Sequence, residues 1–278
     1  MCNIQWQYID LGMTAYKAAW DVQESLHEKK ISQKIRLTKN PDATETPEAD
    51  YLLFTEHNPV YTLGKNGKES NVLITAAERE QQDIEFFHIN RGGDITFHGP
   101  GQIVGYPIID LERIKTDVGW YLRSLEEVMI RTLQEYGISA GRSKGETGVW
   151  IDADIKGKER KICAMGIRIS RWITLHGFAL NVNTDLKYFN HIIPCGIKDK
   201  QVTSIQKELG HTVDMQEVKL KLLQHFTTVF GIEILYEKFQ DQFFTNQYKS
   251  QKNETYNYNA TWIEFFRKGS NKNGKLSS

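Results

Sequence analysis

The feature that most restricts the fold is a pair of long apolar runs, residues 161–170 and 173–181, that are nearly consecutive in the sequence. Only Arg171 and Trp172 separate them. Two apolar runs joined by so short a connection are expected to pair as the antiparallel strands of a hairpin. The runs therefore predict antiparallel sheet structure in the second half of the chain.

Other apolar patterns predict the remaining elements. Strands are expected at residues 5–11, 51–54, 59–63, 84–90, 103–111, 148–151 and 232–236. Apolar residues at helical spacing predict helices at 14–30, 118–136 and 213–230. The polar stretch 39–50, with two prolines, is expected to be a loop. Because no regular strand–helix–strand repeat appears, the pattern favours an α+β fold, with mixed sheets packed against helices.

The composition changes once along the chain. Residues 1–245 have ordinary globular content and are expected to form one domain, since 278 residues with 40% hydrophobic content suffice for a sizeable core. From residue 246 onward Asn, Lys, Ser and Tyr dominate. We therefore expect residues 246–278 to be a C-terminal appendage that is at most partly ordered.

Charge and cysteine content exclude several classes of protein. The 35 basic and 35 acidic residues cancel, so a nucleic-acid partner is not expected. No apolar run is long enough for a membrane span, and the first residues do not look like a signal peptide. Three cysteines give neither a disulfide framework nor a metal knuckle. A cytoplasmic protein without a metal site or a membrane partner is expected.

Positive charge is concentrated in one window of the sequence. Between residues 156 and 207 there are ten Lys or Arg but only three Asp or Glu. Two interpretations remain open: a solvated basic face, or a docking surface for an acidic partner.

Cys195 is the strongest candidate for a reactive group. Pro194 fixes the backbone before it and Gly196 frees the backbone after it, which presents the thiol at a tight bend. Lys161 is the candidate cation beside it, because a neighbouring positive charge favours the nucleophilic thiolate. This combination predicts covalent acyl transfer.

A glycine-rich segment at residues 91–102 is the second candidate. Its four glycines would let backbone N–H groups approach a ligand, but a tight turn without a ligand is an equally good interpretation. Thr96 and His98 would face one cavity if the segment is extended. His98 by itself is more often structural than catalytic. The segment matches neither a P-loop nor a dinucleotide-binding motif.

Several motifs in order resemble the lipoyl(octanoyl) transferases over residues 5 to 235. They are Glu56-His57-Asn58-Pro59-Val60-Tyr61-Thr62-Leu63-Gly64, the Arg91-Gly92-Gly93 loop through Thr96 and His98 to Pro100-Gly101-Gln102, Lys161-Ile162-Cys163-Ala164-Met165-Gly166, His176-Gly177-Phe178-Ala179-Leu180-Asn181 and Pro194-Cys195-Gly196-Ile197. The resemblance implies a fold like the catalytic domain of biotin and lipoate protein ligases, formed here by residues 1–245.

The resemblance also implies an activity. An octanoyl group would move from octanoyl-acyl carrier protein to a specific lysine of a lipoyl domain, as the first step of endogenous lipoate attachment. Cys195 would carry it as a thioester and Lys161 would assist. The donor is already activated, so no cofactor is expected. Acceptors would be the lipoyl domains of 2-oxoacid dehydrogenase complexes and the glycine cleavage H protein, and the enzyme is expected to be a monomer.

The same resemblance implies which residues surround the acyl chain. They are Arg91, Gly92, Gly93, Asp94, Ile95, Thr96, Phe97, His98, Ala164, Met165, Gly166, Gly177, Phe178 and Ala179. Tyr106, Met165 and Phe178 are candidate walls of the tunnel. Arg91 could touch substrate or brace the glycine loop. Arg168, Arg171, Lys198 and Lys200 are candidates for docking an acidic carrier protein.

Three alternatives remain open at this point. The chain could be an ATP-dependent lipoate or biotin protein ligase of the same fold, an amidotransferase that moves lipoyl groups, or a binding protein without activity. A second thiol is also open to two interpretations. Strand alternation would put Cys163 on the same face as Lys161, near the site; otherwise Cys163 is a small buried hydrophobic residue.

Overall fold

The computed structural model describes residues 4–40, 44–193 and 201–236. The chain divides into two compact units, Met1–Leu235 and Tyr236–Ser278. Every element below belongs to the first unit, apart from the last residue of the final strand. The predicted appendage at 246–278 and the candidate nucleophile Cys195 lie outside the described residues.

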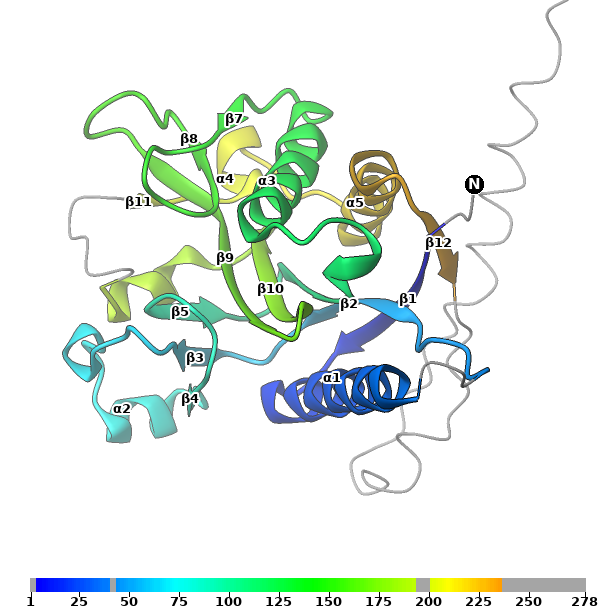
Figure 1. Ribbon diagram of the computed structural model, residues 1–278. Coiled ribbons are helices and arrows are strands. Elements are labelled where there is room, and N and C mark those ends of the chain that lie inside the picture. Colours follow the sequence, from blue (N-terminus) through cyan, green and yellow to red (C-terminus); the bar gives the residue numbers. More distant parts are fainter. Residues whose placement is uncertain (1–3, 41–43, 194–200, 237–278) are drawn as a thin grey trace, which may run out of the picture. The chain divides into compact units, whose positions relative to one another are not determined.

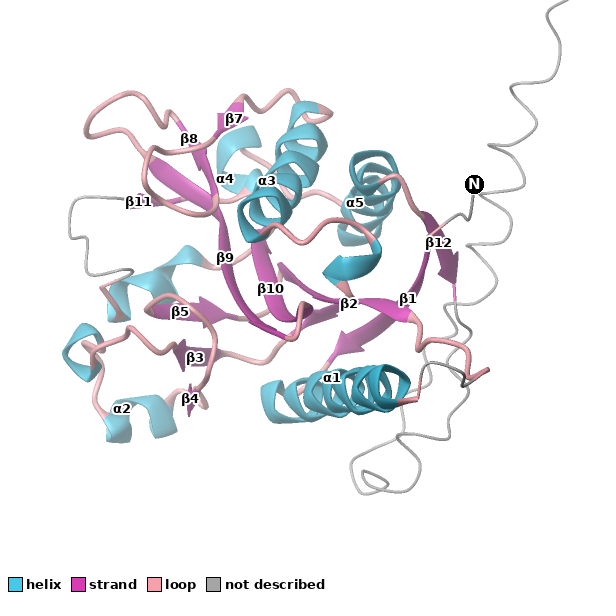
Figure 2. Cartoon of the chain, in the orientation of Figure 1, coloured by secondary structure: helices cyan, strands magenta, loops and turns pink. Residues whose placement is uncertain are grey.

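A large mixed sheet forms the centre of the unit (Figures 1 and 2). Its described strands run in the order β12-β1-β2-β6-β10-β9-β8-β7, and β11 pairs with β9. Their bounds are β1 Gln5–Met13, β2 Asp50–Glu56, β6 Gln102–Ile108, β7 Ala140–Gly141, β8 Val149–Ile151, β9 Arg160–Ser170, β10 Ile173–Asn181, β11 Gln201–Val202 and β12 Glu233–Tyr236. The predicted hairpin is confirmed: β9 and β10 are antiparallel, with Ser170 opposite Ile173.

A smaller sheet of three described strands has the order β4-β3-β5. Its strands are β3 Val60–Leu63, β4 Glu85–His88 and β5 Ile95–His98. The last of these lies inside the glycine-rich segment, so part of that segment is a strand rather than a loop. Short helical turns connect the strands: η1 Glu69–Asn71, α2 Ala76–Gln81, η2 Leu111–Arg113, η3 Leu186–His191 and α4 Ile205–Leu209.

Three long helices cover the two faces of the large sheet (Figure 1). They are α1 Tyr16–Lys39, α3 Val118–Gln134 and α5 Met215–Phe230. Helices α3 and α5 pack over the main core, which includes Phe54, Phe178 and Phe226. Helix α1 packs on the opposite face, through Ala19 against residues such as Val104. No helix in the described ranges is long and apolar enough to cross a lipid bilayer. The predicted α+β class is confirmed.

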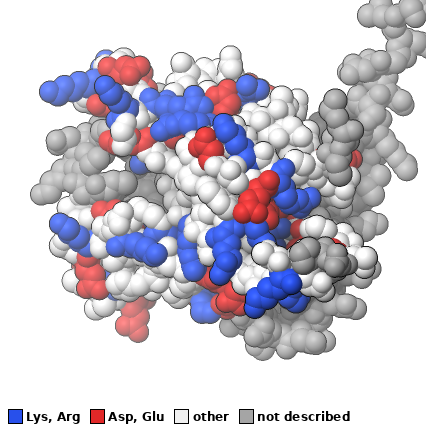
Figure 3. All heavy atoms as spheres, in the orientation of Figure 1, with Lys and Arg blue, Asp and Glu red and all other residues white. Residues whose placement is uncertain are grey.

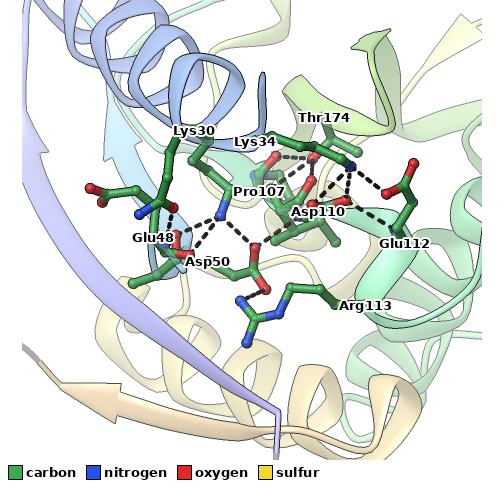
Figure 4. A network of polar contacts seen from close by, with 12 residues as sticks. Lys30, Lys34, Glu48, Asp50, Pro107, Asp110, Glu112, Arg113 and Thr174 are labelled. Atoms are coloured by element: carbon green, nitrogen blue, oxygen red, sulfur yellow. Dashed lines mark hydrogen bonds and ion pairs between the residues drawn. The ribbon is translucent and has the colours of Figure 1, made fainter. Parts of the chain in front are cut away.

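Helix α1 extends to Lys39, beyond the predicted end at residue 30. Its second half is polar even where it is buried, so the apolar period that predicted the helix stops too early. Lys30 is 4% exposed and donates to Asp50, which is fully buried at the start of β2 (Figure 4). Arg113 binds the other carboxylate oxygen of Asp50. Charge pairing therefore replaces apolar contact in this half of the helix.

Candidate active site

A cavity of about 100 Å³ lies over strands β9, β10 and β6 of the large sheet. The side chains that line it come from both sheets, from α1 and from the loop before β5. The described residues of the wall are Tyr16, Arg91, Gly93, Asp94, Ile95, Thr96, His98, Gln102, Val104, Tyr106, Glu146, Trp150, Lys161, Ala164, Met165, Gly166, His176, Gly177, Phe178, Ala179, Asn181, Phe189, Gln201 and Val202.

Small residues of the β9–β10 hairpin line the cavity, and at the two glycines neighbouring backbone leaves no room for a side chain. Gly166 pairs with Gly177, and Ala164 pairs with Ala179, across the β9–β10 hairpin. A Cβ on Gly166 would lie 2.8 Å from the carbonyl oxygen of Gly92, and one on Gly177 would lie 2.1 Å from that of Gly105. Larger side chains would therefore fill the cavity or push the chains apart.

Lys161 lines the cavity from β9 and is only partly buried. Its ammonium nitrogen lies 4.5 Å from the centre of the Trp150 ring, on the neighbouring strand β8. This distance is within the range of a cation–π contact. The side chain is thus held by an aromatic surface beside the cavity.

Cys163 does not share the cavity with Lys161. The pairing of β8 with β9 shifts between Val149, opposite Cys163, and Trp150, opposite Lys161, so β9 carries an extra residue there. Such a bulge breaks the alternation of side chains along a strand. Cys163 is fully buried in the main core, and this burial raises the pKa of its thiol. Of the two interpretations of Cys163 that the sequence left open, the small buried hydrophobic residue is the correct one.

Cys195 lies outside the described residues, so its pairing with Lys161 stays a prediction. The described chain ends at Ile193, whose backbone N–H donates to Asn71. It resumes at Gln201, and the next residue, Val202, pairs with Lys161 in the β11–β9 ladder.

Arg91 braces the glycine-rich loop and also lines the cavity. Its Nη2 donates to the backbone carbonyl and the hydroxyl of Thr62, at 2.8 and 3.1 Å. Its Nη1 donates to the carbonyl of Gly92 at 3.0 Å. The side chain is buried. Arg91 can therefore both brace the glycine loop and touch a substrate in the cavity.

His98 is held in a hydrogen-bond network on β5. Its Nδ1 lies 2.8 Å from the amide oxygen of Gln102, whose amide nitrogen donates to Asn181 and to the carbonyl of Phe97. That network assigns the proton to Nδ1 of His98. Burial lowers the pKa of His98 to about 3, so the ring is neutral. This arrangement supports a structural role for the ring.

Most of the other residues expected around the acyl chain also line the cavity. Gly92 and Phe97 are not among the described lining residues; the Phe97 ring stacks on Tyr188 at 4.5 Å instead. Phe178 touches the cavity, but its ring stacks on Phe226 in the core beneath α5. Phe178 therefore contributes mainly its backbone to the cavity wall.

The sequence did not single out Tyr16 or assign a role to His57. Tyr16, the first residue of α1, is 1% exposed and stacks on His98, with ring centres 6.0 Å apart. His57 follows β2, and its Nδ1 lies 2.7 Å from the carbonyl of Thr14. Its Nε2 lies 2.7 Å from the hydroxyl of Tyr106. His57 stood within one of the recognised motifs, so the motif could have indicated it; no local pattern marks Tyr16.

Comparison with known proteins identifies the family. Residues 15–227 match the family model described as the lipoyl protein ligase A/B catalytic domain. The chain belongs to this family. The resemblance inferred from the sequence motifs is thereby confirmed.

Two similar relatives are both named octanoyltransferase. The protein from Christiangramia forsetii is 53% identical over 229 residues, which cover 82% of this chain and 97% of the relative. The protein from Flavobacterium johnsoniae is 53% identical over 234 residues, which cover 84% of this chain and all of the relative.

Solved structures of the family share the fold at low sequence identity. A crystal structure of lipoate-protein ligase A bound with ATP has a TM-score of 0.60 at 14% identity, covering 84% of this chain and 88% of that one. A bipartite lipoate protein ligase from Thermoplasma acidophilum has a TM-score of 0.57 at 16% identity, covering 84% and 86%. At this identity the likeness supports the fold alone.

Proposed function

We propose that this chain is an octanoyltransferase that attaches octanoyl groups to lipoyl-domain lysines through a thioester on Cys195. The observation that carries the proposal is a narrow cavity, floored by Ala and Gly, with Lys161 at its partly exposed side. Relatives that are about half identical over nearly their whole length carry the name octanoyltransferase. A cavity of this kind suits a single acyl chain, because each buried methylene contributes about 0.8 kcal/mol.

In the first half-reaction, the Cys195 thiolate attacks the carbonyl carbon of the donor thioester. The new sulfur–carbon bond forms as the donor's own sulfur–carbon bond breaks. The Lys161 ammonium, which favours the thiolate before the attack, gives its proton to the departing donor sulfur. The products are acyl-Cys195, neutral Lys161 and the free donor thiol. Because the donor is already a thioester, no ATP enters the balance.

In the second half-reaction, the neutral amine of the acceptor lysine attacks acyl-Cys195. Lys161 accepts the proton that the amine loses as the amide bond forms. Cys195 leaves as a thiolate, and the starting thiolate–ammonium pair is restored. One side chain thus donates a proton in the first half-reaction and accepts one in the second.

The donor in this proposal is octanoyl-acyl carrier protein. The acceptors are the lipoyl domains of 2-oxoacid dehydrogenase complexes and the glycine cleavage H protein, and the enzyme works as a cytoplasmic monomer.

Basic and acidic side chains are interleaved over one face of the molecule (Figure 3). Arg160 is paired with Asp152 and Glu208, which uses part of the basic excess in the sequence.

The four basic residues proposed to dock the acidic carrier protein differ in how available they are. Arg171 is exposed at the turn of the β9–β10 hairpin and is the best described candidate. Arg168 is partly engaged by Glu24, at 3.4 Å. Lys198 and Lys200 lie outside the described residues.

The test is the mass of the intact enzyme after incubation with octanoyl-acyl carrier protein, without ATP. We expect a gain of one octanoyl group that hydroxylamine removes and that the acceptor domain discharges. Cys195→Ser should form no hydroxylamine-labile adduct, whereas the matched variant Cys163→Ala should form it as the wild type does. Octanoylation that requires ATP and survives in Cys195→Ser would instead indicate a ligase. Reaction with a lipoylated protein donor in place of the carrier protein would indicate an amidotransferase.

A further inference from the structure

Three buried aromatic rings, those of Tyr16, His98 and Tyr106, form part of the cavity lining, and we call them the end wall. All three line the cavity and are almost inaccessible to solvent. They come from three elements that are distant in sequence: the start of α1, strand β5 and strand β6. Lys161 lies on β9 and is partly exposed, so the cavity runs from an accessible side to a closed one.

Hydrogen bonds and ring contacts hold the end wall in place. The Tyr106 hydroxyl lies 2.7 Å from Nε2 of His57, whose other ring nitrogen donates to the Thr14 carbonyl. His98 is fixed by Gln102, and Tyr16 lies parallel to His98 with an angle of 6° between the rings. Tyr106 and His98 can move only by breaking a buried hydrogen bond, which is costly, and Tyr16 can move only by losing its stacking on His98.

The wall is also uncharged. Burial lowers the pKa of His57 to about 4 and that of His98 to about 3, and it raises the pKa of both tyrosines. Neutral aromatic rings can receive a terminal methyl group, whereas a charged group would be left without its hydration.

The register of the sheet gives the distance available to a chain. Ala164 on β9 pairs with Ala179 on β10, which in turn pairs with Val104 on β6. Neighbouring strands are about 4.8 Å apart, so the floor from Ala164 to Val104 measures roughly 10 Å. This is about the extended length of an eight-carbon acyl chain. Beyond Val104 the sheet continues into β2, where Leu53 belongs to the same buried cluster as Ala19 of α1.

We propose that the end wall, with the row Ala164–Ala179–Val104, fixes the length of acyl chain that the enzyme accepts. The inference rests on the proposed acyl transfer and adds the residues that select the substrate. A shorter chain leaves part of the floor uncovered and loses about fourfold in affinity per missing methylene. A longer chain must displace a hydrogen-bonded ring. The lost burial of a short chain and the displaced ring of a long chain both lower kcat/KM, so the enzyme selects for eight carbons.

The test compares the rate of acyl-enzyme formation for carrier-protein donors with six to fourteen carbons. Tyr106→Ala removes a ring from the end wall, and we expect the ten-carbon to eight-carbon ratio of kcat/KM to rise tenfold or more. Ala179→Leu fills the floor, and we expect the optimum to move to six carbons or fewer. Tyr106→Phe keeps the ring but loses its hydrogen bond to His57, so we expect the optimum to stay at eight carbons and the ten-carbon to eight-carbon ratio to rise less than in Tyr106→Ala.

Leu222→Ala serves as a control for general loss of stability, because Leu222 lies on α5 in the opposite core. Its chain-length profile should match that of the wild type. If Tyr106→Ala and Ala179→Leu both fold and keep the eight-carbon optimum, the end wall does not select chain length, although acyl transfer stands. If the wild type forms no acyl-enzyme with any donor, the proposed function fails and this inference fails with it.

Discussion

At the scale of single residues, the contact between Lys161 and Trp150 gives the first prediction. The ring lies 4.5 Å from the ammonium nitrogen, and such contacts contribute about 0.5–2 kcal/mol. Trp150→Leu should therefore slow acyl-enzyme formation by roughly 2- to 30-fold, because the Lys161 ammonium group loses the aromatic face that holds it. Single-turnover mass spectrometry at saturating donor would measure this rate.

Trp150→Phe is the matched variant, since it keeps an aromatic face of smaller area. It should retain most of the rate, and the KM for the donor should change little in either variant. If the leucine and phenylalanine variants slow the reaction equally, the ring acts through packing and not through the ammonium group.

Residue-scale reasoning from the sequence is limited where backbone register decides. Ala164, Gly166, Gly177 and Ala179 in the β9–β10 hairpin were expected to surround an acyl chain; all four line the cavity, and their contact with a ligand stays a prediction. The alternation rule then misplaced Cys163, because it assumes an unbroken strand. The local sequence around Lys161 does not predict the β-bulge in β9, because the bulge depends on how β8 pairs with β9.

At the scale of elements, the second half of α1 depends on a buried charge network. Asp50 is fully buried and its two carboxylate oxygens bind Lys30 and Arg113 (Figure 4). Asp50→Ala should lower the free energy of unfolding by about 3–5 kcal/mol, because Lys30 would remain buried without its counter-ion. Urea unfolding followed by circular dichroism would measure this loss.

An exposed pair on the same helix provides the control. The side chains of Lys17 and Asp21 are 57% and 47% exposed. Asp21→Ala should cost less than about 1 kcal/mol. Similar losses for the two variants would contradict the argument, since burial would then not matter.

The network also explains what the sequence could predict of the elements. Periodic apolar residues located the helices and most strands, because burial against one sheet face imposes that period. The period fails where Lys30 and Gln33 are buried with polar partners, so α1 was predicted too short. Strand β5 was also not predicted as a strand. It has four residues inside a glycine-rich segment, and its partner β3 is more than thirty residues away in the sequence.

At the scale of the whole molecule, four buried histidines among the described residues should make the domain sensitive to acid. Burial lowers the pKa of His27, and it lowers the pKa values of His57, His98 and His176 to about 4, 3 and 3. The unfolded chain binds protons at these residues near pH 6.5, whereas the native protein does not until the pH is far lower. Stability should therefore fall as the pH decreases below about 6.5.

Each such histidine should lower the stability by about 1.2 kcal/mol between pH 6 and 5, above the range where most carboxylates titrate. His57→Gln tests the origin of this slope, because an amide can accept from Tyr106, donate to Thr14 and bind no proton. Urea unfolding at pH 7.0, 6.0, 5.5 and 5.0 should give a slope smaller by about one proton in this variant. An identical slope in the wild type and in His57→Gln would mean that His57 is protonated in the native state, and the neutral His57 argued from its burial would then be wrong.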